Sequence, residues 1–150
     1  MKAVIQRVES AKVEIEGEVV GEIGKGLAIL LGVAEGDSEL DADLLCDKIV
    51  KMRIFSDENG KMNLSLGDVD GEMIVVSNFT LNAEYRKGNR PDYFKSAHPS
   101  VANPLYEHFI ERAKAQVRRV ECGRFGADMK YTIVNDGPVT ICADSEVLKK

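Results

Sequence analysis

The chain has 150 residues, of which 44% are hydrophobic and 30% are charged, and its formal net charge is −5 at pH 7. These values are ordinary for a folded protein and exclude a low-complexity or disordered chain. No stretch approaches the roughly 18–20 apolar residues that span a bilayer. Residues 1–10 lack the apolar region of a signal peptide. We therefore expect one soluble, cytoplasmic domain over residues 1–150, with no membrane partner.

The negative net charge argues against a nucleic-acid partner, but the charges are unevenly distributed. Residues 1–75 contain 8 Lys and Arg against 16 Asp and Glu, whereas residues 76–150 contain 12 against 9. A local basic surface is typical of proteins that bind nucleic acids, although a solvated helix face and a polar loop explain the same charges equally well. The basic side chains of the second half fall into two groups, Arg86, Lys87, Arg90 and Lys95, and Arg112, Lys114, Arg118, Arg119 and Arg124.

The first third of the chain predicts several strands. Val4–Val8 is one, and the alternating residues 13–15 and 19–23 predict a hairpin with its turn at Glu16-Gly17. Leu27–Val33 is continuously apolar and short for a helix. This pattern indicates a strand that is covered on both faces in the centre of a sheet.

A helix is predicted to follow Ser38, because Ser38 and Asp41 have the spacing of a capping box. Residues 57–60 predict a turn, and residues 73–76 predict a short strand that leads into Ser77–Leu81. The apolar residues with helical spacing, which we expect to form the buried stripe of the helix, are Leu40, Leu44, Leu45, Ile49 and Met52.

A second helix is predicted to begin with Asn103 as its N-cap and Pro104 at its first position. Strands are predicted at residues 129–134 and 139–142, and residue preferences alone make Asp136-Gly137 a hairpin turn between them. Two isolated helices among runs of strands favour an α+β fold with a largely antiparallel or mixed sheet. The expected buried stripe of the second helix is Leu105, Phe109, Ile110, Ala113 and Val117.

No familiar catalytic or cofactor motif is present. The sequence lacks GxSxG, HExxH and Walker motifs, and residues 24–26 lack the third glycine of a dinucleotide-binding loop. Cys46, Cys122 and Cys142 have no metal-binding spacing, and we expect them to be buried small hydrophobic residues. We therefore expect no cofactor and no metal.

Two segments, Val76–Leu81 and Asn135–Thr140, closely resemble the two signatures of the D-aminoacyl-tRNA deacylase family. One departure lies in the first signature, where the family usually has Ser-Gln-Phe-Thr-Leu and this chain has the shorter amide Asn78. The resemblance extends to about Asp144, and it implies a barrel-like α+β domain with two main helices. Further segments similar to the family, in the same order, are Ala3–Val8, Glu18–Gly24, Lys61–Leu64, Arg86–Pro91 and Gly123–Met129.

The resemblance also implies a homodimer with active sites at the subunit interface. Gly137-Pro138 of one subunit, with a cis peptide bond, is expected to enter the active site of the other and to act as a chiral filter. Its carbonyl oxygens would reject the L-side chain by a built-in clash, whereas glycine would pass. Arg7 matches the family arginine that holds this motif.

The implied activity is hydrolysis of the ester that joins a D-amino acid to tRNA. Such an ester is already activated, so its hydrolysis needs positioning and oxyanion stabilisation more than a strong nucleophile. We interpret Thr80 as a positioning residue and expect a water or the terminal ribose 2′-hydroxyl to do the chemistry. The residues implied are Ser77, Asn78, Phe79 and Thr80 for catalysis, and Arg86, Lys87 and Arg90 for tRNA binding.

Two other classes of protein remain open on the residues alone. One is a non-catalytic, dimeric β-rich module that binds RNA through its basic half, with Asp136–Pro138 as an ordinary turn. The other is a Cys or Ser hydrolase of small esters. That enzyme would need a nucleophile paired with His98 or His108, and the sequence offers no such spacing.

Overall fold

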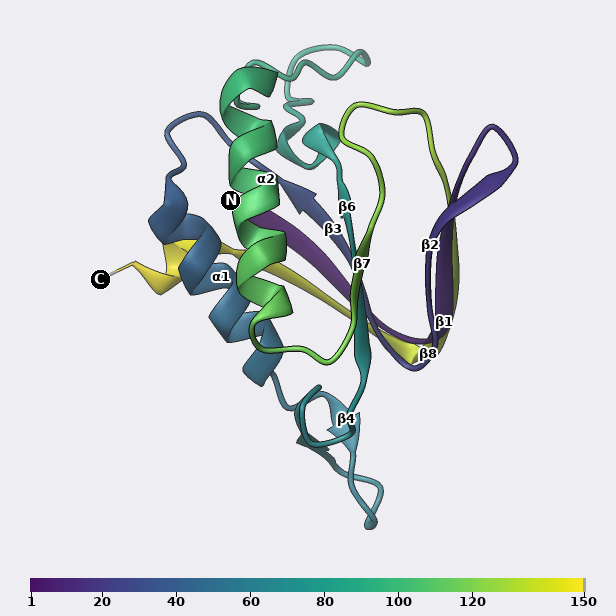
Figure 1. Cartoon of the computed structure of the whole chain (residues 1–150). Coiled ribbons are helices and arrows are strands. Elements are labelled where there is room, and N and C mark those ends of the chain that lie inside the picture. The colour runs from purple at the N-terminus through teal and green to yellow at the C-terminus, as the bar shows by residue number, and fades with distance from the viewer. Residues whose placement is uncertain (150) are drawn as a thin grey trace.

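A computed structural model describes residues 1–149 of the chain and shows a curved sheet with two helices on one side (Figure 1). The helices are α1 (Glu39–Lys51) and α2 (Pro99–Lys114), and two short 3₁₀ helices are η1 (Phe79–Asn82) and η2 (Ser145–Leu148). The strands are β1 (Lys2–Ile15), β2 (Glu18–Ile23), β3 (Gly26–Gly32), β4 (Phe55–Ser56), β5 (Met62–Leu64), β6 (Glu72–Ser77), β7 (Val120–Cys122) and β8 (Lys130–Asp144).

The sheet is mixed, and its long strand β1 pairs with three other strands. The strand order is β2-β1-β3-β6-β7, and β8 also pairs with β1. Residues 2–8 of β1 pair with β3, residues 11–15 pair with β2, and both halves pair with β8. These pairings are antiparallel, whereas β3 with β6 and β6 with β7 are parallel. The predicted mixed sheet and the central position of β3 are confirmed.

The curved sheet nearly closes into a barrel where β2 approaches β7. A Cβ atom at Gly21 would lie 2.9 Å from the carbonyl oxygen of Cys122, so only glycine allows this approach. The inside of the barrel is filled by a cluster that includes the fully buried Val8, Val13 and Ile74. The predicted barrel-like architecture is therefore present.

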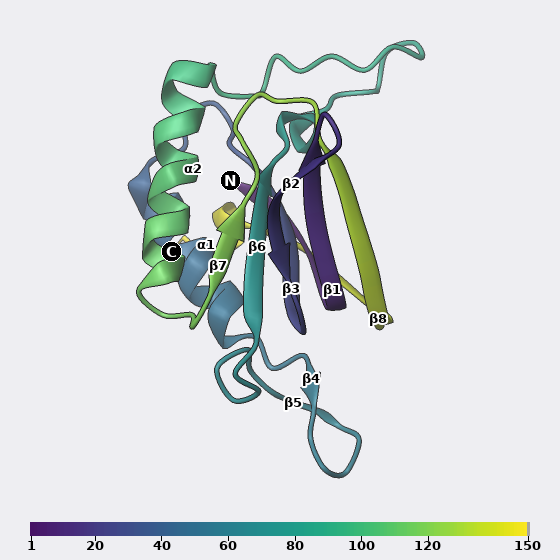
Figure 2. The same cartoon turned by 45° about the vertical axis from the view of Figure 1, so that its right-hand side comes forward.

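A second core lies between the sheet and the two helices (Figure 2). Ile5 and Leu27 from the sheet, Leu45 and Ile49 from α1, and Phe109 from α2 are all fully excluded from solvent. Burying an aliphatic or aromatic side chain of this size stabilises a fold by about 1.5–3 kcal/mol. This core holds the helices against the strands that position the site.

The turn between β1 and β2 and the start of α1 follow the sequence pattern. Glu16 and Gly17 both have positive φ, 50° and 82°, as a two-residue type I′ hairpin requires. The Asp41 carboxylate accepts the Ser38 backbone N–H at 2.9 Å, which is the reciprocal half of the predicted capping box. Leu40 was wrongly placed on the buried stripe, because its side chain is exposed.

The helix α2 begins earlier than predicted, at Pro99 rather than at Asn103-Pro104. His98 is its N-cap, and its Nδ1 accepts the Ser100 N–H at 3.2 Å. Pro99 satisfies the rule that proline is tolerated at the first position of a helix, where its missing N–H costs nothing. Pro104 lies inside the helix, at a position where it removes one backbone donor.

The strand β8 runs without a hairpin from Lys130 to Asp144, so the predicted turn at Asp136-Gly137 is wrong. Its pairing with β1 passes from Asn135, opposite Val8, to Thr140, opposite Gln6. The four intervening residues therefore bulge out of the ladder, opposite Arg7. The cysteine prediction is also wrong for Cys142, which is exposed, whereas Cys46 is buried as expected.

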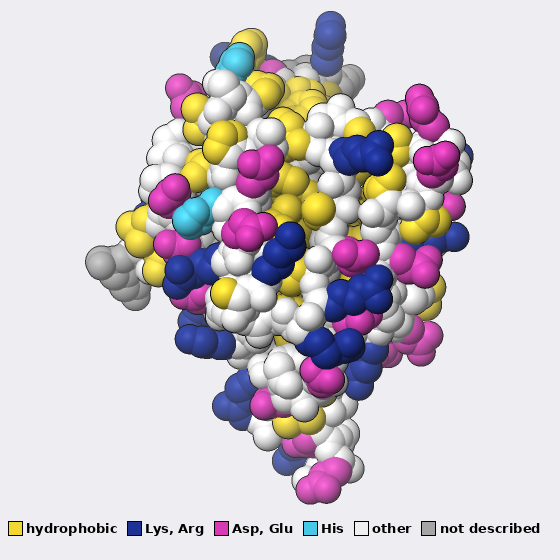
Figure 3. Space-filling view, in the orientation of Figure 1, with side chains coloured by type: hydrophobic (Ala, Val, Ile, Leu, Met, Phe, Trp, Pro, Cys, Tyr) yellow, Lys and Arg dark blue, Asp and Glu magenta, His cyan; other side chains and the backbone are white. Residues whose placement is uncertain are grey.

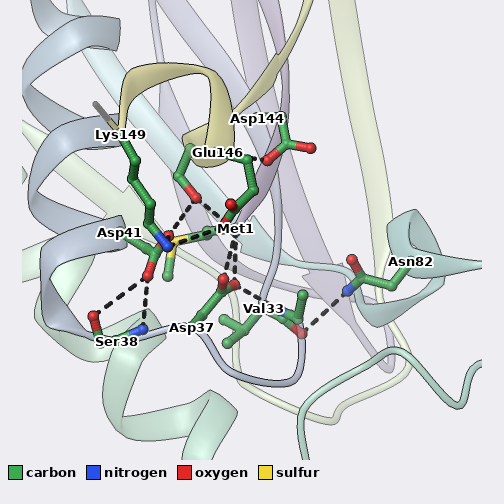
Figure 4. A network of polar contacts seen from close by, with 11 residues as sticks. Met1, Val33, Asp37, Ser38, Asp41, Asn82, Asp144, Glu146 and Lys149 are labelled. Atoms are coloured by element: carbon green, nitrogen blue, oxygen red, sulfur yellow. Dashed lines mark hydrogen bonds and ion pairs between the residues drawn. The ribbon is translucent and has the colours of Figure 1, made fainter.

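A buried polar network ties the first residue of the chain to α1 and η2 (Figure 4). The Met1 amino group donates to Asp37 and to the Ser145 hydroxyl, both at 2.8 Å. Ser145 in turn donates to the fully buried Asp41 carboxylate at 2.7 Å, and Lys149 pairs with the same oxygen at 2.7 Å. Each buried charge therefore has a partner, which is the condition for burial at acceptable cost.

Candidate active site

A pocket of about 790 Å³ opens where β3 and β6 end, beside the start of α2. In Figure 3 hydrophobic side chains gather on the upper part of this face, between α2 and the segment after β7. Most of the lining is apolar. Apart from two tyrosines, the polar side chains that line it are Ser77, Asn78, Ser96, His98 and Asp128. An apolar hollow with few polar groups is the usual form of a small-molecule site.

The first signature forms one wall of this pocket, because β6 ends there. The Asn78 N–H donates to the Leu31 carbonyl at 2.8 Å, which extends the pairing of β6 with β3 by one residue. The chain then turns into η1. A Cβ atom at Gly32 would lie 2.9 Å from the Asn78 carbonyl oxygen, so glycine is required for this close approach. Ser77, Asn78 and Phe79 thereby line the pocket.

The Asn78 side chain is used within the chain, as the cap of η1. Its Oδ1 accepts the Thr80 N–H at 3.2 Å, and the Thr80 hydroxyl donates to the same oxygen. An amide oxygen is not a base, so this hydrogen bond does not activate the hydroxyl. Thr80 is exposed and is not among the residues that line the pocket.

Phe79 presents a free backbone donor at the edge of the pocket. Its carbonyl accepts the Ser96 hydroxyl at 2.9 Å, and its ring meets Tyr93 edge to face with centroids 5.1 Å apart. In the part of the chain that the structure describes, the Phe79 N–H has no hydrogen-bond acceptor. A fixed N–H beside an apolar pocket is suited to stabilise an oxyanion.

The second signature is fixed to the body of the protein by Arg7. The Arg7 guanidinium donates to the Asp136 carbonyl at 3.1 Å and to the Ile54 carbonyl at 2.8 Å. Gly137 has φ +133°, the Gly137-Pro138 bond is cis, and both residues are exposed. The bulge therefore exposes its backbone to solvent, and the Arg7 side chain holds it to the body of the protein.

The two signatures do not meet within one chain. Gly137 and Pro138 are not among the residues that line the pocket. The bend of β8 lies at the lower end of the sheet in Figures 1 and 2, whereas η1 lies at the upper end. One copy of the chain therefore does not bring both signatures to one substrate.

The two basic groups of the sequence differ in the structure. Arg86, Lys87 and Arg90 are exposed on the loop after η1, and within residues 1–149 none of them forms an ion pair. Four members of the other group face acids. Arg112 pairs with Asp43 and Asp47, Lys114 with Glu111, Arg118 with Asp70 and Glu72, and Arg119 with Glu72 and Glu121. Of the two groups, the one on the loop therefore carries more positive charge that no acid of residues 1–149 pairs with.

The histidines and cysteines give no support to a Cys or Ser hydrolase. His98 lines the pocket, but its Nδ1 caps α2. His108 contacts Asp43 at 2.7 Å and joins the two helices. Burial raises the pKa of the Cys46 thiol to about 12, so this residue is not a thiolate at neutral pH.

Sequence reasoning missed several residues of the pocket. Tyr93 and Phe125 line it, and Phe125 also packs against Tyr106 with ring centroids 6.0 Å apart. Phe125 lies in the Gly123–Met129 segment, and its resemblance to the family was the available signal. Tyr93 lies in a polar loop without periodicity, so no pattern indicated that it faces Phe79.

Comparison with known proteins defines the family. A family model described as D-Tyr-tRNA(Tyr) deacylase matches residues 4–144. A Caldicellulosiruptor saccharolyticus protein named D-aminoacyl-tRNA deacylase is 56% identical over 146 residues, 97% of this chain and 98% of the relative. A Dehalococcoides mccartyi protein of the same name is 57% identical over 145 residues, covering 97% of this chain and 95% of the relative. The chain belongs to the D-Tyr-tRNA(Tyr) deacylase family, as the two signatures predicted.

Solved structures agree with this assignment. A structure named c-Myc DNA Unwinding Element Binding Protein has a TM-score of 0.91 and 39% identity, and the match covers 96% of this chain and 98% of that one. Another, titled as a probable eukaryotic D-amino acid tRNA deacylase, has a TM-score of 0.80 at 15% identity, covering 95% and 98%. The second likeness shows the fold alone, and both confirm the predicted α+β architecture. No helix of residues 1–149 has the length and apolar character to cross a bilayer.

Proposed function

We propose that the chain is a D-aminoacyl-tRNA deacylase that hydrolyses the ester of D-amino acids, and of glycine, on tRNA in the cytoplasm. Membership of the deacylase family supports this assignment. The observation that carries it is the placement of Ser77, Asn78 and Phe79 on the wall of an apolar pocket, with the Phe79 N–H unpaired among the described residues. This site can hold an ester and stabilise the charge that develops on its carbonyl oxygen.

In this mechanism the protein positions and stabilises rather than attacks. The ester carbonyl oxygen lies against the Phe79 N–H, and the Asn78 and Thr80 side chains keep η1 in shape. The attacking oxygen comes from water or from the ribose 2′-hydroxyl. Removing one oxyanion donor from an enzyme costs about 10²–10³-fold in kcat, so a single well-placed N–H is a substantial contribution.

The chiral filter is proposed to come from a second copy of the chain in a homodimer. Gly137-Pro138 is exposed, and the Asp136 carbonyl just before it is held by Arg7, away from the pocket of its own subunit. In the dimer the carbonyls of the bulge would lie beside the Cα atom of the substrate. An L-side chain would clash with them, whereas a D-side chain or the hydrogen of glycine would not.

Substrate binding is proposed to be electrostatic and local. Replacing Arg86, Lys87 and Arg90 by Glu should weaken tRNA binding far more than the same change at Lys48, Lys51 and Lys61. Added salt should weaken binding by the wild type and should affect the first variant less, because fewer counterions are released. Equal effects of the two triple variants in a filter-binding titration would contradict this proposal.

The test of the function is a deacylation assay of the purified protein. D-Tyr-tRNA and Gly-tRNA should be hydrolysed, whereas L-Tyr-tRNA should be spared. A protein that binds tRNA but hydrolyses none of the three esters would instead be the non-catalytic RNA-binding module. Hydrolysis of D- and L-Tyr-tRNA at equal rates would remove the chiral filter from the proposal.

A further inference from the structure

Two large aromatic rings stand free on the loop that follows η1. The Tyr85 side chain is 77% exposed and the Phe94 side chain is 85% exposed. Figure 2 shows this loop, residues 84–95, projecting from the upper end of the molecule. Aromatic side chains usually lose most of their surface to the core, so two exposed rings on one short loop indicate contact with a ligand.

The loop is anchored rather than loose. Glu84 and Asp92 exchange two backbone hydrogen bonds, both 2.9 Å long, and the Lys95 side chain pairs with Glu84 at 2.7 Å. The Lys95 carbonyl also accepts the Glu35 N–H at 2.8 Å. The two ends of the loop are therefore joined to each other, and Lys95 is fixed to the segment that follows β3, so Tyr85 and Phe94 lie at defined places.

The same loop forms the rim of the pocket. Tyr93, which precedes Phe94, lines the pocket and packs on Phe79. Ser96, at the end of the loop, lines it as well and donates to the Phe79 carbonyl. The loop that carries Tyr85 and Phe94 therefore borders the pocket in which the reacting end of a substrate would lie.

Exposed aromatic rings can bind either another protein or a nucleic acid, and the charge of the loop distinguishes these two kinds of partner. Residues 84–95 contain four basic and two acidic side chains, a net charge of +2 in a chain of net charge −5. Arg86, Lys87 and Arg90 stand between the two rings in the sequence and form no ion pair with any residue from 1 to 149. A protein interface over the rings would also cover these cations, which is costly without acids to meet them. A single-stranded nucleic acid can bind both kinds of side chain at once, because its bases stack on the rings and its phosphates contact the cations.

We propose that Tyr85 and Phe94 stack on the bases of the unpaired nucleotides just before the 3′-terminal nucleotide of tRNA, while the neighbouring cations contact their phosphates. Stacking on aromatic rings between basic side chains is the general way in which proteins hold single-stranded nucleic acid. This proposal rests on the proposed function, because it takes the pocket to hold the aminoacylated end. It assigns to the loop the recognition of RNA outside the pocket.

The test compares a full substrate with one that ends at the pocket. Tyr85→Ala and Phe94→Ala should each weaken the binding of tRNA by about 5- to 150-fold, the range expected for loss of one stacked base. Both variants should hydrolyse D-tyrosyl-adenosine, which has no upstream nucleotide, at the wild-type rate. Leu40→Ala on α1, which removes an exposed apolar side chain far from the loop in sequence, is the matched control and should change neither reaction.

A spectroscopic readout makes the stacking itself visible. A tRNA with 2-aminopurine at an unpaired position before the 3′-terminal nucleotide should lose fluorescence on binding the wild type. The loss should persist with Phe94→Tyr and disappear with Phe94→Leu, which keeps an apolar side chain but has no ring face.

The results distinguish the two proposals. Three results would each overturn the stacking proposal: an unchanged tRNA affinity in a variant that combines Tyr85→Ala with Phe94→Ala, an equal loss of hydrolysis on D-tyrosyl-adenosine, or a weakened dimer in light scattering. The last of these would assign the rings to a second copy of the chain. Wild-type protein that binds and quenches the labelled tRNA without hydrolysing either ester would overturn the proposed function alone.

Discussion

The two signature segments lie on the same sheet, yet they are built in opposite ways. Ser77–Phe79, at the end of the buried strand β6, line the pocket, and the Asn78 and Thr80 side chains are hydrogen-bonded to each other in η1. Asn135–Thr140 bulges from a strand, lines no pocket among the described residues and exposes its backbone. The first segment, Ser77–Thr80, borders a pocket that can receive a substrate, and the second, Asn135–Thr140, projects from the sheet. In the proposed homodimer, the two motifs would form one site only after two copies of the chain assemble.

The largest effect is expected from a substitution that distorts the projecting segment, Asn135–Thr140. A Cβ atom at Gly137 would lie 2.9 Å from Val139 Cγ2 and 3.0 Å from its backbone nitrogen, at a φ of +133° that L-residues rarely adopt. Gly137→Ala should therefore displace the bulge and lower D-Tyr-tRNA deacylation by about 100-fold, as small misplacements in a site do. The rate and the D-to-L ratio measure this effect.

Subunit mixing sharpens that experiment. Ala102 lines the pocket, so Ala102→Trp is expected to fill it and to abolish activity. Mixing this variant with Gly137→Ala would give heterodimers with one intact pocket facing one intact bulge, and activity should return. If no activity returns although mass spectrometry detects heterodimers, the two segments act within one chain and the dimer proposal fails.

A smaller effect is expected from loosening the bulge without changing its backbone. Arg7→Ala removes the hydrogen bonds to Asp136 and Ile54, so it should lower the D-to-L ratio less than Gly137→Ala does. Two partly buried carbonyls lose a charged donor, and the free energy of unfolding should fall by about 1–3 kcal/mol. Urea unfolding and the same deacylation assay measure both effects, and an unchanged D-to-L ratio would show that Arg7 only stabilises the fold.

In the receiving segment we expect Thr80→Val to retain most activity. Loss of a true nucleophile costs about 10⁶-fold in a serine protease, so even a moderate residual rate decides the question. Asn78→Ala should be more harmful than Thr80→Val, because it removes the cap of η1 and with it the fixed position of the Phe79 N–H. Asn78→Asp keeps the acceptor and is the control. Complete inactivity of Thr80→Val with intact tRNA binding would return Thr80 to the nucleophile role.

The smallest effect concerns the stability of the fold that carries both segments. Burial alone would raise the pKa of Asp41, but hydrogen bonds from Lys149, Ser145 and Ser38 outweigh it and lower the pKa below its ordinary value. A lowered folded-state pKa means stability that is present at neutral pH and is lost as pH falls below about 4. Asp41→Asn should reduce this acid-dependent loss by on the order of 2 kcal/mol in urea unfolding. An identical pH profile for the variant would show that Asp41 makes no such contribution.

Much of the fold followed from local patterns in the sequence. The hairpin at Glu16-Gly17, the central strand β3 and the capping box at Ser38 are local features that a few adjacent residues determine. The errors concern choices that local patterns leave open. Pro99 and Pro104 are both acceptable helix-start signals, and β7 has only three residues. Residues 136–139 form a bulge rather than a hairpin turn because both halves of β8 pair with β1. That pairing joins residues more than 100 positions apart, so local patterns do not reveal it.

The site was predictable only in part, for a similar reason. The signatures indicated Ser77, Asn78 and Phe79, which do line the pocket. The basic group around Arg112 and Arg118 looked free in the sequence, but its acidic partners Asp47 and Asp70 come from distant segments. Net charge along a chain therefore overstates the positive surface wherever the fold brings acids from elsewhere.

The central position of β1 also has a consequence for synthesis. Lys2 pairs with Asp144 and Val13 pairs with Tyr131, so β1 cannot complete its pairing until β8 has been synthesised. A ribosome must deliver almost the whole chain before this pairing forms, and such non-local strand contacts slow folding. Until then one edge of β1, with the apolar Val4, Ile5 and Val8 along it, lacks its partner and invites pairing with other chains. The nascent protein is thus most exposed to aggregation, and most dependent on chaperones, until residues 130–144 have been synthesised.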